Sequence, residues 1–294
     1  MTTPLGSLLS TSFQRCQQRL QPLALGVLLF GSLVAIVSTV ANQRIEGHIM
    51  EGMRSLGVDQ GRMMELQKKI QSGEEGVIEE TMAEMNTMMG GVDSMSDDER
   101  NAMFQREGMA MMFRVLPVMS VGAFAWAVIS LLATAYYLFF AVGKGKDAVE
   151  ILSNSLHSVI PLLGVWIWSF LRSFAWIPLV GIIPAVILGP RFVLAPVILV
   201  TQNKCVTGSV SESYEKTRGF WGKIIGNMLV LCLILLVISW AISLVTLPIA
   251  LTSRVLSIWI HSVVQQGTMA YGMMFLVLLT KTIVEQAPGV VKKK

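Results

Sequence analysis

Six apolar runs, most about 20 residues or longer and almost free of charge, constrain the fold of this chain more than any other feature. A helix that crosses the hydrocarbon core of a bilayer needs about 20 apolar residues. The 294-residue chain is 53% hydrophobic and 14% charged, with a mean hydropathy of +0.62, which excludes a disordered chain, a nucleic-acid-binding domain and an ordinary cytosolic enzyme. We predict an all-α, polytopic membrane bundle of about six transmembrane helices, at residues 22–42, 115–142, 158–177, 179–201, 224–251 and 257–280.

The charged residues divide unevenly between the two sides of such a membrane. Residues 43–112 carry 14 of the 19 acidic residues but only 7 of the 23 basic residues, a net charge of −7. Because Lys and Arg gather in cytoplasmic loops, we expect this segment outside and both termini inside. The short outer loops then keep only Arg172 and Arg254. We predict a multi-pass protein of the cell (inner, cytoplasmic) membrane with a cytoplasmic N-terminus and a cytoplasmic C-terminus.

The spans divide the chain into five segments. We predict a cytoplasmic N-terminal segment, a first transmembrane helix, an acidic and methionine-rich helical extracytoplasmic domain, a five-helix membrane domain and a basic cytoplasmic tail, at residues 1–21, 22–42, 43–114, 115–281 and 282–294. The first run ends in Thr39-Val40-Ala41, which suits signal-peptide cleavage. Its apolar stretch is longer than the 7–15 residues typical of a signal peptide and favours an uncleaved anchor.

The three cysteines, Cys16, Cys205 and Cys232, lie far apart in the sequence. None falls in the outer segment, where an oxidising compartment would favour disulfides. We therefore expect no disulfide framework and no zinc site. Cys16 precedes the first apolar run and is expected to be a free thiol, with palmitoylation as the alternative.

The outer segment carries helical signals. Residues 62–70 contain good helix formers, and residues 74–89 end at Gly90-Gly91, a pattern typical of a helix C-terminus. Ser96-Asp97-Asp98-Glu99 resembles a capping box that starts a helix through Arg114 and directly into the second span. We expect a small helical domain or a protruding pair of long helices with a cap.

Methionines are concentrated in this outer segment, which holds 13 of the 19 in the chain. Met82, Met85, Met88 and Met89 fall on one face of a helix. Thioether sulfur is a soft ligand that suits Cu(I), so an extracytoplasmic metal site is one hypothesis. We favour the alternative, that the methionine stripe packs helix against helix, and we predict no cofactor.

Two cytoplasmic connectors have an amphipathic helical pattern, at residues 147–156 and 206–221. We predict that both form short helices lying in the membrane interface. In the second, Ser209 and Glu212 have the spacing of a capping box, and Gly219 is expected at the C-terminal end. The residues expected to face anionic lipid headgroups are Lys144, Lys146, Lys216, Arg218, Lys223 and Trp221.

The fourth run is interrupted by prolines that recur every six residues, from Pro178 to Pro196. We expect this helix to be kinked or broken near Gly189-Pro190. Arg191 follows near mid-span, where a charge costs about 2.5–3.5 kcal/mol, so it should face the protein interior or a wet cavity. Its candidate partners are Glu212, Glu215 and Glu150. Arg191 is interpreted either as an anion or headgroup site or, as we favour, as a structural residue that ties the break to the connector.

The stretch from Arg191 through Ala195-Pro196 to Val200, followed by Ser209, Glu212-Ser213, Lys216-Thr217-Arg218-Gly219 and Trp221, resembles a known family. It is similar to the polytopic bacterial membrane proteins related to the membrane domain of glycerophosphoryl diester phosphodiesterase, over about residues 115–285. In this chain Gln202-Asn203 replaces the acid usual after the span. The resemblance implies a six-span helical fold, and it does not imply catalysis, because the phosphodiesterase activity of such proteins belongs to a separate barrel domain.

The sequence contains no catalytic constellation. The three histidines, His48, His157 and His261, lie far apart, and no serine or cysteine has a base at motif spacing. We predict a non-enzymatic scaffold or membrane-assembly or membrane-integrity factor. A small-solute transporter or channel at Arg191 is the first alternative, and extracytoplasmic Cu(I) binding is the second. The predicted partners are the bilayer, its anionic headgroups and a protein bound through residues 43–112, but no nucleic acid.

Overall fold

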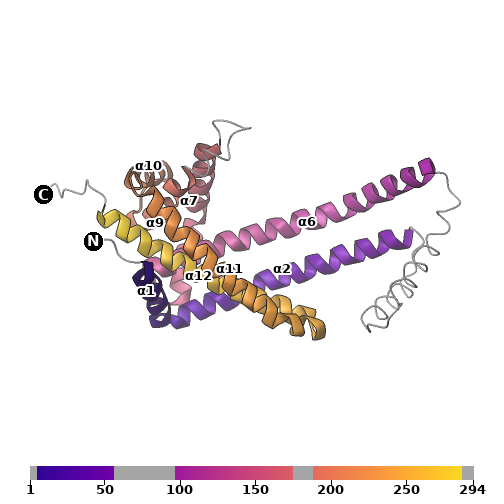
Figure 1. The fold of residues 1–294 in the computed structure, drawn as a ribbon, viewed down its shortest axis with the longest axis horizontal. Coiled ribbons are helices and arrows are strands. Elements are labelled where there is room, and N and C mark those ends of the chain that lie inside the picture. Colours follow the sequence, from indigo (N-terminus) through magenta and orange to yellow (C-terminus); the bar gives the residue numbers. More distant parts are fainter. Residues whose placement is uncertain (1–4, 56–96, 175–187, 287–294) are drawn as a thin grey trace. The chain divides into compact units, whose positions relative to one another are not determined.

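The computed structural model describes residues 5–55, 97–174 and 188–286 of the chain. Within these ranges every regular element is a helix, which confirms the predicted all-α class. Residues 188–192 form a short helical stretch, and the longer elements are labelled in Figure 1. They are α1 (Leu5–Gln18), α2 (Leu20–Ser55), α6 (Asp97–Val142), α7 (Ala148–Phe174), α9 (Ala195–Gln202), α10 (Val206–Lys216), α11 (Trp221–Thr252) and α12 (Arg254–Gln286).

Five helical segments in the described ranges are long and apolar enough to cross a membrane. They are Leu20–Gly52, Gly108–Val142, Ala148–Ser173, Trp221–Thr252 and Arg254–Glu285. The predicted fourth run shows only its second half, a shorter apolar helix at Leu188–Gln202, because residues 179–187 lie outside the described ranges. In the described part of the chain, these five helices are therefore the candidates for membrane-spanning helices.

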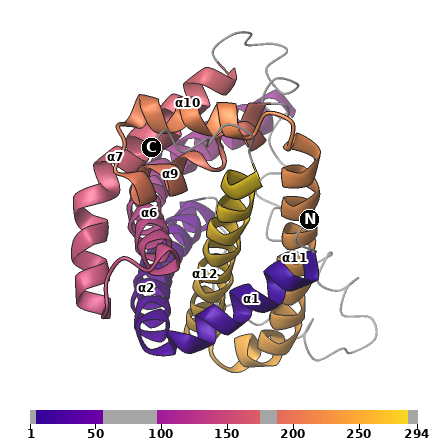
Figure 2. The same cartoon turned by 90° about the vertical axis from the view of Figure 1, so that its left-hand side faces the viewer.

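The chain forms two compact units, Met1–Ile36 with Ala127–Lys294, and Val37–Trp126. In the first unit α11 and α12 form an antiparallel hairpin joined at Ser253, whose extended backbone (φ −150°) ends α11. Figure 2 shows α1 lying across α12, and α7, α9 and α10 packed together. The region around α9 and α10 positions the candidate site.

An aromatic cluster joins α2 to α6 in the first unit. Phe30, Tyr136 and Tyr137 meet edge to face, with ring centroids 5.6–6.0 Å apart. The Tyr136 hydroxyl donates a hydrogen bond of 2.7 Å to the carbonyl oxygen of Pro22. The three rings are almost fully buried, so they supply a large apolar contact with defined geometry.

Two glycines let α2 approach its neighbours closely. A Cβ atom at Gly26 would collide with the Tyr136 ring, and one at Gly31 would lie 2.7 Å from the Cα atom of Val263 in α12. The second contact is with backbone, which cannot rotate away. Small residues at such positions permit the close packing on which helix association in a membrane depends.

The helix α1 was not predicted from the sequence, which assigned residues 1–21 only to a cytoplasmic segment. Leu8, Ser12 and Cys16 are its buried residues, and their spacing places them on one face. The Tyr271 hydroxyl of α12 donates a hydrogen bond of 3.2 Å to the carbonyl oxygen of Leu9. Burial raises the pKa of Cys16 to about 11, and the thiol is free, so an acyl group on Cys16 would have to displace α1.

Arg19 lies between α1 and α2 and closes the C-terminus of α6. Its guanidinium donates hydrogen bonds to the carbonyl oxygens of Phe140, at 2.8 Å, and Gly145, at 2.5 Å. It also lies 5.2 Å from the centroid of the Phe140 ring. A cation at this end satisfies carbonyls left free by the helix and complements the negative end of its dipole.

In the second unit, α2 and α6 pack antiparallel. A Cβ atom at Gly122 would lie 3.3 Å from Cβ of Ala41, and one at Gly52 would lie 3.5 Å from the side chain of Met111. Arg114 and Glu51 approach to 3.9 Å. The helix expected to run through Arg114 into the second span is confirmed, because α6 is continuous from Asp97 to Val142. The predicted helices at 62–70 and 74–89 lie outside the described residues.

The first connector differs from its prediction as a separate short helix. Residues 148–156 are the first part of α7, which continues without interruption to Phe174. The physical reason is local. Pro161 inside α7 removes only one backbone hydrogen bond, and no glycine or turn sequence separates residue 156 from residue 158.

Candidate functional site

The break in the fourth apolar run lies later than the sequence predicted. Residues 188–192 are helical across Gly189-Pro190, and the interruption falls at Val193 and Leu194, immediately before α9. Pro196 explains the shift, since it occupies the first turn of α9, where its missing N–H costs nothing. The same proline cannot continue a helix from the residues before it.

The carbonyl oxygen of Arg191, just before the break, is held by α10. Ser213 donates a hydrogen bond of 2.6 Å to this oxygen, and the Thr217 hydroxyl lies 3.4 Å from it. Both hydroxyls are buried on the face of α10 that meets α9. The break is therefore tied to the second connector through the backbone of Arg191, a role that does not require an arginine side chain.

The connector helix α10 begins four residues earlier than the predicted capping box implies. Its N-cap is Cys205, whose side chain makes no capping bond, and Asn203 turns the chain with a left-handed φ of +50°. Ser209 lies within the helix and donates to the carbonyl oxygen of Cys205, so the predicted Ser209–Glu212 capping box is wrong. Gly219 has the positive φ expected of it, +88°, after α10 has ended at Lys216.

Three side chains from other elements lie against the ring of Tyr214, on α10. The guanidinium carbon of Arg191 lies 4.8 Å from the ring centroid, and that of Arg172, at the end of α7, lies 5.7 Å from it. Phe192 stacks on the same ring at 6.0 Å with an interplanar angle of 27°. The Nε atom of Arg191 is buried and has no hydrogen-bond partner. The site thus combines two cations with an aromatic platform.

The predicted carboxylate partner Glu212 is engaged elsewhere. It accepts hydrogen bonds from Lys204 and Lys216 and a third, of 3.1 Å, from the side-chain amide of Gln202. Partial burial opposes the charge of the carboxylate, but these hydrogen bonds outweigh burial and lower the pKa of Glu212. Glu212 therefore closes the turn between α9 and α10 and does not neutralise Arg191.

The other two candidate partners of Arg191 also have different roles. Glu150 accepts a hydrogen bond of 2.7 Å from the backbone N–H of Lys146, and Asp147 accepts one of 2.8 Å from the N–H of Glu150. This reciprocal arrangement caps the start of α7. Glu215 is exposed on α10. Within the described part of the chain, no acidic side chain forms an ion pair with Arg191 or Arg172.

The predicted headgroup residues are only partly brought together. Lys144 donates a hydrogen bond of 3.0 Å to the side chain of Asn203, and Lys216 is bound to Glu212. Lys146 and Arg218 are exposed in the turns that precede α7 and α11, respectively. The remaining two residues, Trp221 and Lys223, belong to the first turn of α11 and not to the connector helix.

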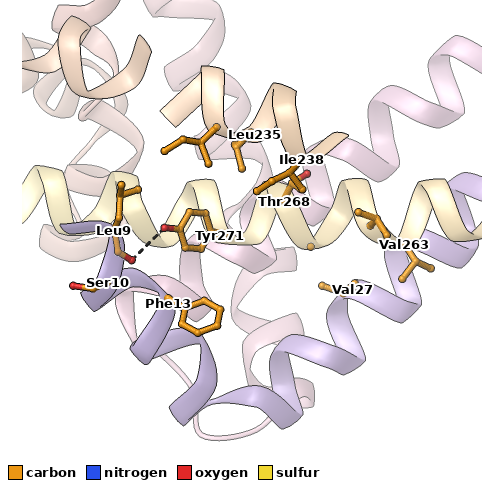
Figure 3. Close-up of a pocket in the computed structure, with 12 residues that line it drawn as sticks. Leu9, Ser10, Phe13, Val27, Leu235, Ile238, Val263, Thr268 and Tyr271 are labelled. Carbon is orange, nitrogen blue, oxygen red and sulfur yellow. Dashed lines mark hydrogen bonds between the residues drawn. The ribbon is translucent and has the colours of Figure 1, made fainter. Parts of the chain in front are cut away.

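An apolar groove of about 720 Å³ lies between α1, α2, α11 and α12. Figure 3 shows Leu9, Phe13, Leu235 and Ile238 around it, and the Tyr271 hydroxyl hydrogen-bonded to Leu9. Ser10 and Thr268 are its other polar side chains. Because the lining is mainly apolar, the groove has few groups that could orient a polar solute.

The described residues do not test the hypothesis that the methionine stripe binds Cu(I). Met82, Met85, Met88 and Met89 all lie outside the described residues, so their assignment to Cu(I) stays a prediction. Among residues 5–55, 97–174 and 188–286, no group of three or more His, Cys, Asp or Glu side chains is placed to hold a metal ion.

Sequence reasoning missed two members of the site, Arg172 and Tyr214. The sequence pattern places Arg172 in an outer loop and does not single out Tyr214. The available signal was the charge of Arg172 within an apolar run, the same argument that singled out Arg191.

Comparisons of the chain with family models, curated proteins and solved structures give no match. The resemblance over residues 115–285 therefore stays a prediction.

Proposed function

We propose that this chain is a non-enzymatic integral membrane protein that acts as a scaffold or as a membrane-assembly or membrane-integrity factor. The observation that carries the proposal is the uncovered apolar surface of its long helices. In the most apolar stretch of Gly108–Val142 no residue is buried, and in that of Trp221–Thr252 only 6% are buried. Such surface needs lipid or the helices of a partner to cover it.

The proposed location is the cell (inner) membrane, with both termini on the cytoplasmic side. The basic residues near α7 and α10 and the acidic charge of residues 43–112 support this orientation. In this arrangement the side chains around α10 meet anionic headgroups, and residues 43–112 meet a protein partner outside. The resemblance to a family of polytopic membrane proteins without a catalytic domain is consistent with the proposal.

A transporter or channel is the second candidate, and one observation favours it. The Nε atom of Arg191 is buried without an acceptor, beside a helix interrupted at Val193 and Leu194. Broken helices with unpaired polar groups form the substrate sites of many transporters. Against this candidate, the Arg191 site is bounded by the connector helix α10, which carries several charged residues and is unlike a transmembrane path.

Two measurements on the full chain test the scaffold against the transporter. The first compares the entry of a normally excluded dye into cells with and without the gene. The second measures the flux of phosphate, chloride and potassium ions through liposomes that contain the purified protein. The scaffold predicts a leaky membrane in the deletion strain, rescue by the full chain, and flux equal to that of protein-free liposomes. Flux above that level supports the transporter, and an unchanged barrier in the deletion strain contradicts the integrity function.

A further inference from the structure

We propose that Arg172 and Arg191 form an anion-binding site on the Tyr214 ring, and that the ligand is the phosphate group of a membrane lipid. The proposal deepens the scaffold function and rests on it for the source of the ligand. In this proposal two arginines bind the lipid headgroup, whereas the sequence predicts that role for the lysines of the connectors.

The first argument is the lack of an internal counter-ion. Both guanidinium carbons lie within 6 Å of one ring centroid, at 4.8 and 5.7 Å. Both positive charges therefore lie beside the same ring, and an anion bound there would face two cations. Glu212, a partly buried acid on α10, is bound by Lys204, Lys216 and Gln202.

The second argument is the unpaired donor. The Nε atom of Arg191 is buried and makes no hydrogen bond, although buried polar groups in folded proteins almost always have a partner. The aromatic contact with Tyr214 attracts the positive charge but accepts none of the N–H groups in a conventional hydrogen bond. An anion at this position would satisfy the donor as well as the charge.

The tetrahedral arrangement of its oxygens favours phosphate over a carboxylate. One guanidinium fork occupies both oxygens of a planar carboxylate in a bidentate pair. The two charged oxygens of a lipid phosphodiester diverge from a tetrahedral phosphorus, so each can accept from a guanidinium group that approaches from a different helix. Arg172 arrives from the end of α7 and Arg191 from the segment before α9, which is the arrangement that a tetrahedral anion suits.

The surroundings of Arg172 favour a lipid as the source of the phosphate. Arg172 is exposed, and Trp168 and Leu171 on the same helix are also exposed, at 43% and 46%. A phosphate bound at Arg172 would therefore carry its apolar chains along an uncovered apolar helix surface. Free inorganic phosphate shares the anion chemistry but would leave that surface exposed.

Direct binding to the purified full chain tests the site. The probes are short-chain phosphatidylglycerol and inorganic phosphate, added to delipidated protein in a non-ionic detergent and followed by calorimetry. The variants are Arg172→Gln, Arg191→Gln and Arg191→Lys, and Arg15→Gln on α1 is the charge-matched control. Loss of one charged hydrogen-bonding group is expected to weaken lipid binding roughly tenfold.

The proposal expects this loss in Arg172→Gln and Arg191→Gln, a smaller loss in Arg191→Lys, which keeps the charge without the fork, and wild-type binding in Arg15→Gln. Equal affinity for inorganic phosphate and lipid overturns the lipid source. Equal weakening in all variants, or in none, overturns the site. If Arg191→Gln fails to fold, Arg172→Gln decides, because its side chain is exposed. If an arginine variant loses lipid binding but cells that carry it still exclude the dye, the binding site is supported and its link to the scaffold function is contradicted. If a variant binds lipid normally but its cells admit the dye, the barrier defect has another cause and does not count against the site.

Discussion

The guanidinium carbon of Arg172 lies 5.7 Å from the centroid of the Tyr214 ring. The six-span arrangement places Arg172 in an outer loop and Tyr214 in an inner connector, separated by a hydrocarbon core about 30 Å thick. A direct contact is incompatible with that separation. Because α10 carries Glu212, Lys216 and other charges, we expect it to lie outside the hydrocarbon, with Arg172 on the same side.

We therefore expect α7 to begin and end on the side of α10, leaving α2, α6, α11 and α12 to cross the membrane. Lys144, just before α7, supports this expectation, since it is hydrogen-bonded to Asn203 just before α10. The arrangement keeps both termini on one side. It also removes Arg172 from the outer loops, which agrees better with the distribution of basic residues.

Thiol labelling on intact cells and inverted vesicles measures this topology. Cys205 is exposed, and the hydrogen bonds from the Gly208 N–H and the Thr207 hydroxyl lower its pKa, so it should react readily with an impermeant maleimide. In chains with one cysteine each, we expect Leu171→Cys and Cys205 to react from the same side. Thr252→Cys, at the α11–α12 turn, should react from the other. Labelling of Leu171→Cys together with Thr252→Cys would support six crossings.

The close approach of α2 to α12 predicts that Gly31→Ala destabilises the protein. The added Cβ would lie 2.7 Å from the Cα atom of Val263, and backbone cannot rotate away, so we expect a loss of about 1–3 kcal/mol. Gly47→Ala is the matched control in the same helix, because a Cβ there meets no atom within 4 Å. The control should be neutral or stabilised by up to roughly 1 kcal/mol. Thermal unfolding in detergent compares the two, and equal midpoints would show that the helices are further apart.

Arg19 is expected to stabilise the junction of α1, α2 and α6. Its side chain donates hydrogen bonds to the carbonyl oxygens of Phe140 and Gly145, and charged hydrogen bonds of this kind contribute about 1.5–3 kcal/mol. Arg19→Ala should therefore lower the unfolding midpoint clearly more than Arg15→Ala, since Arg15 makes neither of these two hydrogen bonds. Arg19→Lys should fall between them, since it keeps the charge but loses the planar fork. A midpoint for Arg19→Ala equal to that of Arg15→Ala would contradict this role.

The sequence predicts some parts of this structure well for physical reasons that can be named. The long apolar helices follow from the length of their runs, and the continuity of α6 through Arg114 follows from helix signals on both sides. The break before Pro196 was expected a few residues too early, because several prolines compete and only packing decides which of them interrupts the helix. The Ser209–Glu212 spacing suggested a cap, but α10 begins at Val206, and both side chains found partners elsewhere.

Only part of the candidate site can be predicted from the sequence, and the reason differs from that for the fold. Arg191 stands out because a charge in an apolar run is costly, and the sequence alone identifies it. Its neighbours are decided by tertiary contacts between α7, α9 and α10 that no local pattern contains. Tyr214 and Arg172 therefore could not be paired with it in advance, and three acids at plausible sequence distances were assigned in their place. The α1 helix was missed for the opposite reason, since its amphipathic pattern was present but no partner surface was yet known.

The pH dependence of the α9–α10 turn follows from Glu212. Hydrogen bonds from Lys204, Lys216 and Gln202 hold the pKa of Glu212 below its usual value of 4.5, despite partial burial. Because the folded-state pKa is lowered, Glu212 contributes stability that is fully present above pH 4.5 and is lost as the pH falls through the folded-state pKa. Lys204 is 46% exposed, so solvent screening limits the contribution to about 1 kcal/mol or less.

Replacing Glu212 by Gln should therefore lower the free energy of unfolding by up to about 1 kcal/mol at neutral pH and change it little at strongly acidic pH. Unfolding midpoints in detergent, measured from about pH 7 to about pH 3, provide the comparison. Glu215→Gln is the control, because that exposed side chain joins none of these hydrogen bonds. A Glu212→Gln difference that stays constant over the same range would show that the carboxylate charge does not stabilise the turn.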